Sequence, residues 1–298
     1  MHHTVRARLG AAALLVSALG LVAPAAAPSQ AAVAHHTTAR AVAHMPMLSF
    51  KISTSGKVRL AHGPAAFRPG RIAFKVTSKS QSATLGFVRF ARGYSFKSFH
   101  RDLAAMNKGN MKALKRAIKH TTFYGGAGDL GSGAVRGTVV LPKAGSYTVY
   151  NFGGNLPKKG PTLHAVGRPQ HRAAPKTSAT LTALNGIRFG GASTLPQRGT
   201  VLLKNKASDS PHFFEVDQVL PGTTKQQILD YFQSGSQAPP TFFVGPGFGT
   251  EVVGPHQSMT LKYHLSPGTY AELCFFPDPA MHGMPHAAMG MIRIITVK

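Results

Sequence analysis

Residues 258–275 read Ser258-Met-Thr-Leu-Lys-Tyr-His-Leu-Ser-Pro-Gly-Thr-Tyr-Ala-Glu-Leu-Cys-Phe275. In the first eight positions apolar and polar side chains alternate, which places Met259, Leu261 and Tyr263 on one face. A period of two is typical of a strand with one buried face. The stretch therefore predicts β structure, and its second part has a counterpart earlier in the chain.

That counterpart is Gly145-Ser-Tyr-Thr-Val-Tyr-Asn-Phe152, which matches Gly268-Thr-Tyr-Ala-Glu-Leu-Cys-Phe275. A predicted strand precedes each copy, over residues 137–141 and 258–265. Further upstream, residues 71–76 and 200–204 also have the pattern of strands, and each leads into a polar loop. The repeated order indicates two copies of one β unit.

Each copy also contains a predicted helical insertion. In the second copy it covers residues 224–232, with Thr223 as the expected N-cap. In the first copy it lies within residues 98–119 and is interrupted near Gly109-Asn110. Its apolar stripe consists of Leu103, Met106, Leu114 and Ile118. Short strands with a helical insertion predict an all-β fold of two tandem antiparallel β-sandwiches, at 45–168 and 178–298, joined by a basic linker at 169–177.

The N-terminus has the pattern of an export signal. Arg6 and Arg8 precede an apolar run over residues 9–22, which is too short to span a bilayer. Small-residue cleavage sites follow at residues 32–34 and, as a rival, at residues 25–27. We expect a signal peptide over residues 1–34, a flexible N-terminus over residues 35–44, and a secreted, extracytoplasmic protein, with association with the cell envelope as a further option.

Cys274 is the only cysteine of the chain, so it has no intrachain disulfide partner. Two histidines and four methionines follow it within residues 275–291, and thiolate, thioether and imidazole are donors that suit copper. The first copy of the repeat has none of these groups at the corresponding positions: Asn151 aligns with Cys274, and Ala83-Thr84-Leu85 aligns with the stretch around His212. The candidate metal ligands therefore lie only in the second copy.

The end of the chain resembles the cupredoxins, the plastocyanin and pseudoazurin-like blue-copper proteins. The resemblance rests on Cys274, on the run His286-Ala-Ala-Met-Gly-Met291, and on the upstream segment Lys204-Asn205-…-Pro-His212. It covers the second copy and extends to the first only as a fold. The chain is also similar to actinobacterial secreted two-domain proteins whose cupredoxin-like domains end in a Cys-Phe-x-Pro-Asp-Pro…Pro-His…Gly-Met pattern.

The resemblance implies one copper ion in a type 1-like site, held by His212, Cys274 and His286 with Met291 as the weak axial ligand. His282 and Met289 are alternatives for a histidine and the methionine. From Cys274 to His286 the chain advances 12 positions, a longer segment than in simple cupredoxins. Phe213 stands where the family usually has an Asn that braces the ligand loop.

Charge is distributed very unevenly. Residues 35–168 contain 22 basic and 2 acidic residues, a net charge of +20, whereas residues 178–298 contain 8 and 7, a net charge of +1. Such a field attracts anionic partners, for which an anionic cell wall, a membrane surface and an acidic redox partner are candidates. No interleaving of aromatic and basic residues indicates nucleic-acid binding. We expect a monomer.

Two classes of function follow from these patterns. The first is a copper-binding protein that carries electrons or holds copper, for which no catalytic group is needed. The alternative is a metal-free interaction module that attaches to the envelope through its basic first copy. An enzyme is disfavoured, because copper oxidases need additional histidines, typically paired as His-x-His, and the chain has no such pair.

Overall fold

A computed structural model describes residues 44–298 except 81, 129, 131–132, 209 and 237. The expected signal peptide and residues 35–43 lie outside the described residues. Within the described part, none of the helices combines the length and the apolar character needed to cross a membrane.

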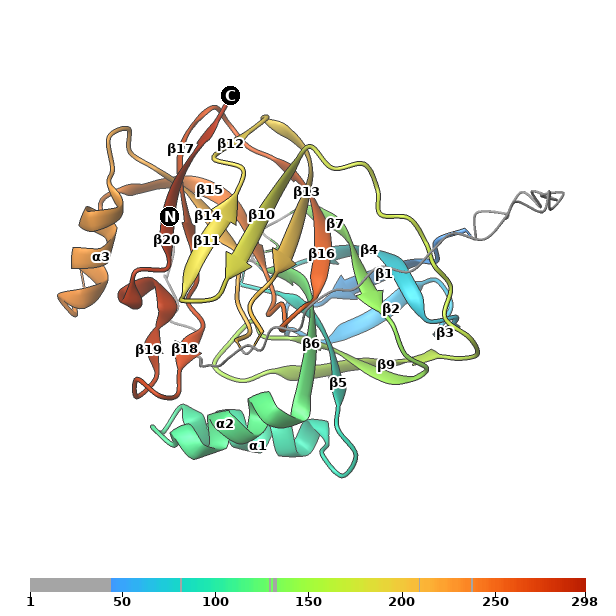
Figure 1. Ribbon diagram of the computed structural model, residues 1–298. Coiled ribbons are helices and arrows are strands. Elements are labelled where there is room, and N and C mark those ends of the chain that lie inside the picture. Colours follow the sequence, from blue (N-terminus) through green and yellow to red (C-terminus); the bar gives the residue numbers. More distant parts are fainter. Residues whose placement is uncertain (1–43, 81, 129, 131–132, 209, 237) are drawn as a thin grey trace, which may run out of the picture.

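Most of the described chain is β structure, arranged in two large sheets and one small hairpin (Figure 1). The first sheet has eight strands. In sheet order they are β11 (Arg188–Gly191), β10 (Ala179–Leu184), β13 (Arg198–Asn205), β16 (Ser258–His264), β7 (Ala134–Leu141), β4 (Gly70–Ser78), β1 (Met47–Ile52) and β2 (Val58–His62).

The second sheet has ten strands. In sheet order they are β12 (Thr194–Leu195), β20 (Ile292–Val297), β17 (Gly268–Leu273), β14 (Glu215–Val219), β15 (Phe243–Thr250), β6 (Thr121–Gly128), β5 (Leu85–Phe90), β8 (Gly145–Asn151), β9 (Lys158–Ala165) and β3 (Ala66–Phe67). Strands β18 (Pro277–Asp278) and β19 (Met284–Pro285) form a separate two-stranded sheet.

The core lies between the two large sheets. Alternate side chains of the strands are buried, as a period of two requires. In the first half of the chain the rings of Phe50 and Phe87, from opposite sheets, have centroids 5.8 Å apart. In the second half the rings of Phe248 and Tyr263, again from opposite sheets, have centroids 5.5 Å apart. One continuous apolar cluster extends through both halves.

The strands of the first half have counterparts in the second half, and in each sheet the counterparts stand in mirrored order about the middle. The counterparts are β1 and β10, β4 and β13, β5 and β14, β6 and β15, β7 and β16, β8 and β17, and β9 and β20. The halves meet where β7 pairs with β16 and β6 pairs with β15, both antiparallel. At this junction the hydroxyl oxygens of Thr138 and Thr260 lie 2.9 Å apart. Both sheets are therefore continuous across the two halves.

The tyrosine of the Gly-[Ser/Thr]-Tyr repeat has the same role in each half. Tyr147 donates its hydroxyl hydrogen to the carbonyl oxygen of Lys143 at 2.7 Å, and Tyr270 donates to that of Ser266 at 3.0 Å. Each bond reaches back four residues and fixes the turn that enters β8 or β17. Both rings are fully buried, so the repeated tyrosine serves the core as well as the turn.

The helices lie outside the sheets. Helix α1 (Phe96–Met106) begins at Ser95, and α2 (Met111–His120) begins at Asn110, whose side chain accepts from the amide of Ala113. The predicted interruption at Gly109-Asn110 agrees with the gap between them, since Gly109 has a φ of 85°. Two helices therefore form the insertion of the first half (Figure 1).

The N-cap expected at Thr223 was wrong by one residue. Helix α3 (Lys225–Gln233) begins at Thr224, whose hydroxyl accepts from the amide of Gln227. The Gln227 side chain in turn accepts from the Thr224 amide at 2.8 Å, so this capping box satisfies the main-chain amides of Thr224 and Gln227. Gln226, which would complete the same exchange for Thr223, instead donates to the carboxylate of Asp230 at 2.7 Å.

Residues 171–177 have no helix or strand, but the segment between the halves is anchored. Gln170 forms an isolated bridge with Gly70. The buried guanidinium of Arg172 donates to the carbonyl oxygens of Arg68 and Arg71, both at 3.2 Å. The domain limits at 45–168 and 178–298 remain predictions, because the sheets do not divide between the halves.

Candidate metal centre

His212 lies between β13 and β14 and is fixed by its main chain. Its amide donates to the carbonyl oxygen of Val253 at 3.0 Å, and the Val253 amide donates back at 2.9 Å. Val253 also forms a bridge with Tyr124 of β6, which belongs to the first half. The position of His212 therefore depends on a segment that pairs with both halves.

Asn205, at the end of β13, braces the loop that carries His212. Its side-chain NH2 donates to the carbonyl oxygens of Ser210 at 2.7 Å and Val253 at 2.9 Å, and its oxygen accepts from the amide of Ala207 at 2.9 Å. Phe213, which replaces the expected bracing Asn, is therefore not needed for that purpose. In the sequence, the only signal for this residue is the resemblance, which includes an Asn near the end of this strand.

Cys274 directly follows β17, and His286 is the first residue of the 3-10 helix η1 (His286–Met289). The Ala287 amide donates to the Cys274 carbonyl oxygen at 2.7 Å, and the His286 amide donates to that of Phe276 at 3.0 Å. These two main-chain bonds join the two ends of the segment that runs from Cys274 to His286. The intervening residues form the hairpin β18–β19, which accounts for the length of the segment.

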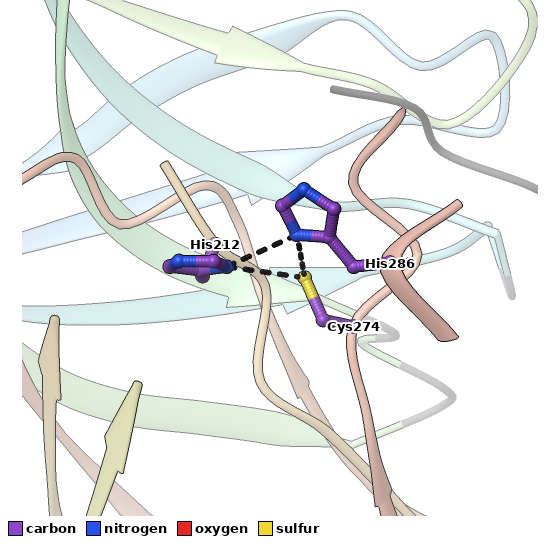
Figure 2. Close-up of side chains that lie close together, drawn as sticks. All are labelled: His212, Cys274 and His286. Carbon is purple, nitrogen blue, oxygen red and sulfur yellow. Dashed lines mark hydrogen bonds between the residues drawn. The ribbon is translucent and has the colours of Figure 1, made fainter. Parts of the chain in front are cut away.

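The three side chains converge (Figure 2). The Cys274 Sγ lies 3.7 Å from Nδ1 of His212 and 3.6 Å from Nδ1 of His286, and the two Nδ1 atoms are 3.2 Å apart. In a triangle with these sides, the point equidistant from the three atoms lies about 2.0 Å from each. Metal–nitrogen bonds in proteins measure about 2.0–2.1 Å and zinc–thiolate bonds about 2.3 Å. The triangle therefore has the size of one metal ion's coordination plane.

All three side chains are removed from water, with exposed fractions of 0% for Cys274 and His286 and 1% for His212. Burial raises the pKa of the Cys274 thiol to about 12 and lowers the pKa of His286 to about 4. Burial, and secondarily the neighbouring His286, lowers the pKa of His212 well below its usual value. Both imidazoles are therefore neutral at neutral pH, the form that coordinates metals.

The donor set fits copper. Two imidazoles and one thiolate in a trigonal arrangement are typical of type 1 copper, and buried polar groups that face one another need a partner to offset their desolvation. Within the described residues this is the one cluster of three or more histidine, cysteine or acidic side chains suited to an ion. A thiol must lose its proton to bind a metal, so a cation would reverse the direction of the Cys274 pKa shift.

The other candidates lie differently. Met291 is fully buried, belongs to the same apolar cluster as Cys274, and donates its amide to the His286 carbonyl oxygen at 2.8 Å. Met289 is only half-buried at the end of η1. His282 is exposed on the hairpin, with a φ of 52°. The structure thus brings together His212, Cys274 and His286, and leaves His282 outside the cluster.

The corresponding place in the first half is filled by an amide. Asn151 accepts from the amide of Thr84 at 2.9 Å, just as Cys274 accepts from that of Phe213 at 3.4 Å. Its NH2 group donates to the carbonyl oxygen of Gly56 at 3.0 Å. Asn151 therefore bonds main-chain groups where Cys274 faces two imidazole side chains.

No protein-family profile and no curated protein matches the sequence. Among solved structures, the chain is similar to an auracyanin from Roseiflexus castenholzii, at 21% identity over 42% of this chain and 99% of that one, with a TM-score of 0.27. Auracyanin A, described as a "blue" copper protein from Chloroflexus aurantiacus, is 13% identical over 40% of this chain and 96% of its own, with a TM-score of 0.27. Rusticyanin from Thiobacillus ferrooxidans is 21% identical over 40% of this chain and 75% of its own, with a TM-score of 0.25. At these values the likeness determines neither the site nor the function.

Proposed function

We propose that this chain binds one copper ion in a type 1-like site formed by His212, Cys274 and His286, either to transfer electrons or to hold the ion. The observation that carries the proposal is the triangle of three buried donor atoms, whose size suits one ion. Met291 is proposed as the weak fourth donor, because it is fully buried beside the segment that positions His286.

Bound copper would supply one-electron chemistry by alternating between two oxidation states. The chain's own contribution is a fixed set of donors. His212 is held by paired main-chain bonds to Val253, and Cys274 and His286 by the bonds that close their segment. Donors that are held this firmly rearrange little when the charge of the ion changes. Burial also protects the thiol from oxidation, because oxidants react with exposed thiolates.

An aromatic layer packs against the centre. The rings of Phe276 and His286 have centroids 6.0 Å apart, and those of Phe213 and Phe276 lie 5.6 Å apart. Both phenylalanines are only 5% exposed. This layer excludes water from the donors, which suits either role, and neither role needs a catalytic group.

The test is to add Cu(II) to the purified protein and to record its visible spectrum together with a metal count. We expect one copper per chain with an intense copper–thiolate absorption. Cys274→Ser should abolish the absorption, whereas His264→Gln, which changes an exposed histidine of the same half, should leave it unchanged. Stoichiometric binding without thiolate absorption in the wild type would refute the type 1-like site.

We further propose that the protein acts outside the cytoplasm and that its basic half attaches it to an anionic surface of the cell envelope. Support comes from the insertion formed by α1 and α2, whose lysines are all exposed. The only acidic residue of the insertion, Asp102, is buried and accepts hydrogen bonds from Arg101 and Arg116. The outer face of the insertion therefore carries positive charges with no acidic side chains between them.

Co-sedimentation of the full chain with phosphatidylglycerol vesicles tests this attachment. We expect binding at low salt and release at high salt, because charges are screened over about 8 Å at physiological ionic strength. The variant Lys108→Gln, Lys112→Gln, Lys115→Gln, Lys119→Gln should bind much more weakly. The matched control Lys204→Gln, Lys206→Gln, Lys225→Gln, Lys262→Gln removes as many exposed charges from the other half and should bind like the wild type. Equal loss in both variants would contradict a docking role for the insertion, and vesicle binding without copper binding would favour the metal-free interaction module.

A further inference from the structure

The hairpin β18–β19 contributes no side chain to the buried cluster of His212, Cys274 and His286. The bonds from the Ala287 amide to Cys274 and from the His286 amide to Phe276 already close the segment. Beyond them the chain continues outward, with Pro277 paired to Pro285 and Asp278 paired to Met284. The positions of the buried donors therefore do not account for this extension between two of them.

The tip of the hairpin is held firmly from within. Asp278 is 2% exposed, and its carboxylate accepts from the amides of Ala280 at 2.6 Å and Met281 at 3.3 Å. Its carbonyl oxygen accepts from Gly283 at 2.8 Å. The Met284 amide donates to the Met281 carbonyl oxygen at 2.9 Å, which closes a tight turn. The buried carboxylate is thus occupied with main-chain donors of the turn.

The side chains that this turn presents are soft metal donors. Met281 is 46% exposed and Met284 is 41% exposed, and they account for two of the six large apolar side chains that are exposed within the described residues. His282 lies between them and is exposed as well. Met281 and Met284 are the first and fourth residues of this closed turn, which places their two Cα atoms within about 7 Å of each other. Two thioethers and one imidazole on such a turn form a donor set that selects Cu(I) over hard cations.

An exposed donor set of this kind bears on how copper reaches the buried centre. Its three donors have at most 1% exposure, so an ion can reach them only if a covering segment moves. The hairpin lies within the segment that joins Cys274 to His286, which are themselves two of these donors. A Cu(I) ion held at the tip would therefore already be attached to the segment that carries two of the buried donors.

We propose that Met281, His282 and Met284 form a second, exposed copper site that captures Cu(I) and delivers it to the buried centre. Capture stands on the hairpin alone, whereas delivery rests on the proposed function of the buried centre. In the delivery step the bonds from Cu(I) to the thioethers and the imidazole break as bonds to Sγ of Cys274 and to the two Nδ1 atoms form. The thiol proton passes to water, and copper remains Cu(I) throughout.

The test is anaerobic titration of the full chain with Cu(I), with a chromophoric Cu(I) chelator as competitor. We expect two equivalents for the wild type and one for Cys274→Ser, which retains only the hairpin site. The variant Met281→Leu, His282→Asn, Met284→Leu should lose the equivalent that binds at the hairpin. Its buried centre should also load more slowly from limiting Cu(I). Asn is chosen because it tolerates the positive φ of His282.

A closely matched control is available in the same chain. Met47 is also 46% exposed, and His256 is exposed with a φ of 59°, so Met47→Leu, His256→Asn changes the same residue types in equivalent environments. This control should bind and load like the wild type. Wild-type stoichiometry in the hairpin variant would overturn the proposal, as would complete loss of Cu(I) binding in Cys274→Ser. If the buried centre binds nothing but Cys274→Ser still holds the equivalent that the hairpin variant loses, capture is supported and the proposed function of the buried centre fails.

Discussion

Asn205 and Asn151 are buried amides that hold loops through the same number of hydrogen bonds. Asn205 bonds Ser210, Val253 and Ala207, and so supports the loop of His212. Asn151 bonds Gly56, Thr84 and Gly153 in the half that contributes no side chain to the cluster of three donors. Comparing them separates stability from metal binding at the level of single residues.

Asn205→Ala should lower the free energy of unfolding by about 1–3 kcal/mol, because it leaves buried main-chain groups without a partner. It should also weaken and shift the copper–thiolate absorption, since the loop of His212 loses its brace. Asn151→Ala should cost a similar amount of stability in urea denaturation and leave the absorption unchanged. An unchanged absorption in Asn205→Ala would show that the loop keeps its position without the amide.

Met291 and Met289 compete for the role of weak fourth donor, and only Met291 is fully buried. Met291→Leu should raise the reduction potential of the bound copper, because the axial ligand tunes the potential and an apolar replacement favours Cu(I). Met289→Leu is the matched control and should leave the potential unchanged. Voltammetry of the two variants decides the assignment, and a shift only in Met289→Leu would reverse it.

The resemblance to cupredoxins was sufficient to select the three converging donors. Cys274 followed by His286 and Met291 matches the order of ligands in that family, and His212 matches its upstream histidine, which follows a strand that often carries an Asn. The sequence was not sufficient to predict the partner of His212. Val253 lies in an apolar stretch without a motif, and its pairing with His212 and Tyr124 depends on contacts that are distant in the sequence. Such pairings follow from the assembled sheets rather than from local pattern.

Among the secondary-structure elements, the two helices of the first half depend on one buried carboxylate. Asp102 accepts hydrogen bonds from Arg116 of α2 at 3.0 Å, from Tyr94 at 3.0 Å and from Arg101 at 3.3 Å. Burial alone would raise the pKa of Asp102, but the hydrogen bonds from Arg116 and Tyr94 outweigh it and lower the pKa. The apolar stripe predicted these helices, while the ion pair that joins them has no sequence signature of its own.

Asp102→Asn should lower the free energy of unfolding by about 1–3 kcal/mol at neutral pH. A carboxyl whose folded pKa lies below its unfolded value adds stability above the unfolded pKa and loses it as the pH falls through the folded pKa. The difference between wild type and variant should therefore diminish below about pH 4. Urea denaturation across this range measures it, and a difference that grows toward acid would contradict the assignment.

The hairpin β18–β19 was missed because its strands are two residues long and contain proline. Local pattern cannot separate such strands from loop. Its closing bonds come from Asp278 and from the turn itself. The 12-residue distance between Cys274 and His286 was the available signal, and it indicated an insertion without indicating its form.

On the scale of the whole molecule, the sequence predicted two sandwiches in series, and the structure joins their sheets. In strands β7 and β16 apolar and polar side chains alternate, as they also would in edge strands of two separate domains. The pattern therefore could not reveal that the two strands pair with each other. Gly137 lies at this junction, where an added Cβ would meet the Thr260 carbonyl oxygen at 2.3 Å and the Phe74 ring at 2.7 Å. The junction therefore tolerates no side chain at this position without movement.

Gly137→Ala should lower the free energy of unfolding by about 1–3 kcal/mol through overpacking. Because the sheets are continuous, we expect faster amide hydrogen exchange in both halves. Gly133→Ala is the control, since an added Cβ there meets nothing within 4 Å. Faster exchange confined to one half would indicate that the halves are independent domains after all.

The central claim, that three buried side chains hold one copper ion, is tested most directly by X-ray absorption at the copper edge of the loaded protein. We predict one sulfur and two nitrogen neighbours at about 2.0–2.3 Å, as the triangle of donor atoms requires. A first shell of nitrogen and oxygen alone, without a short copper–sulfur distance, would contradict it.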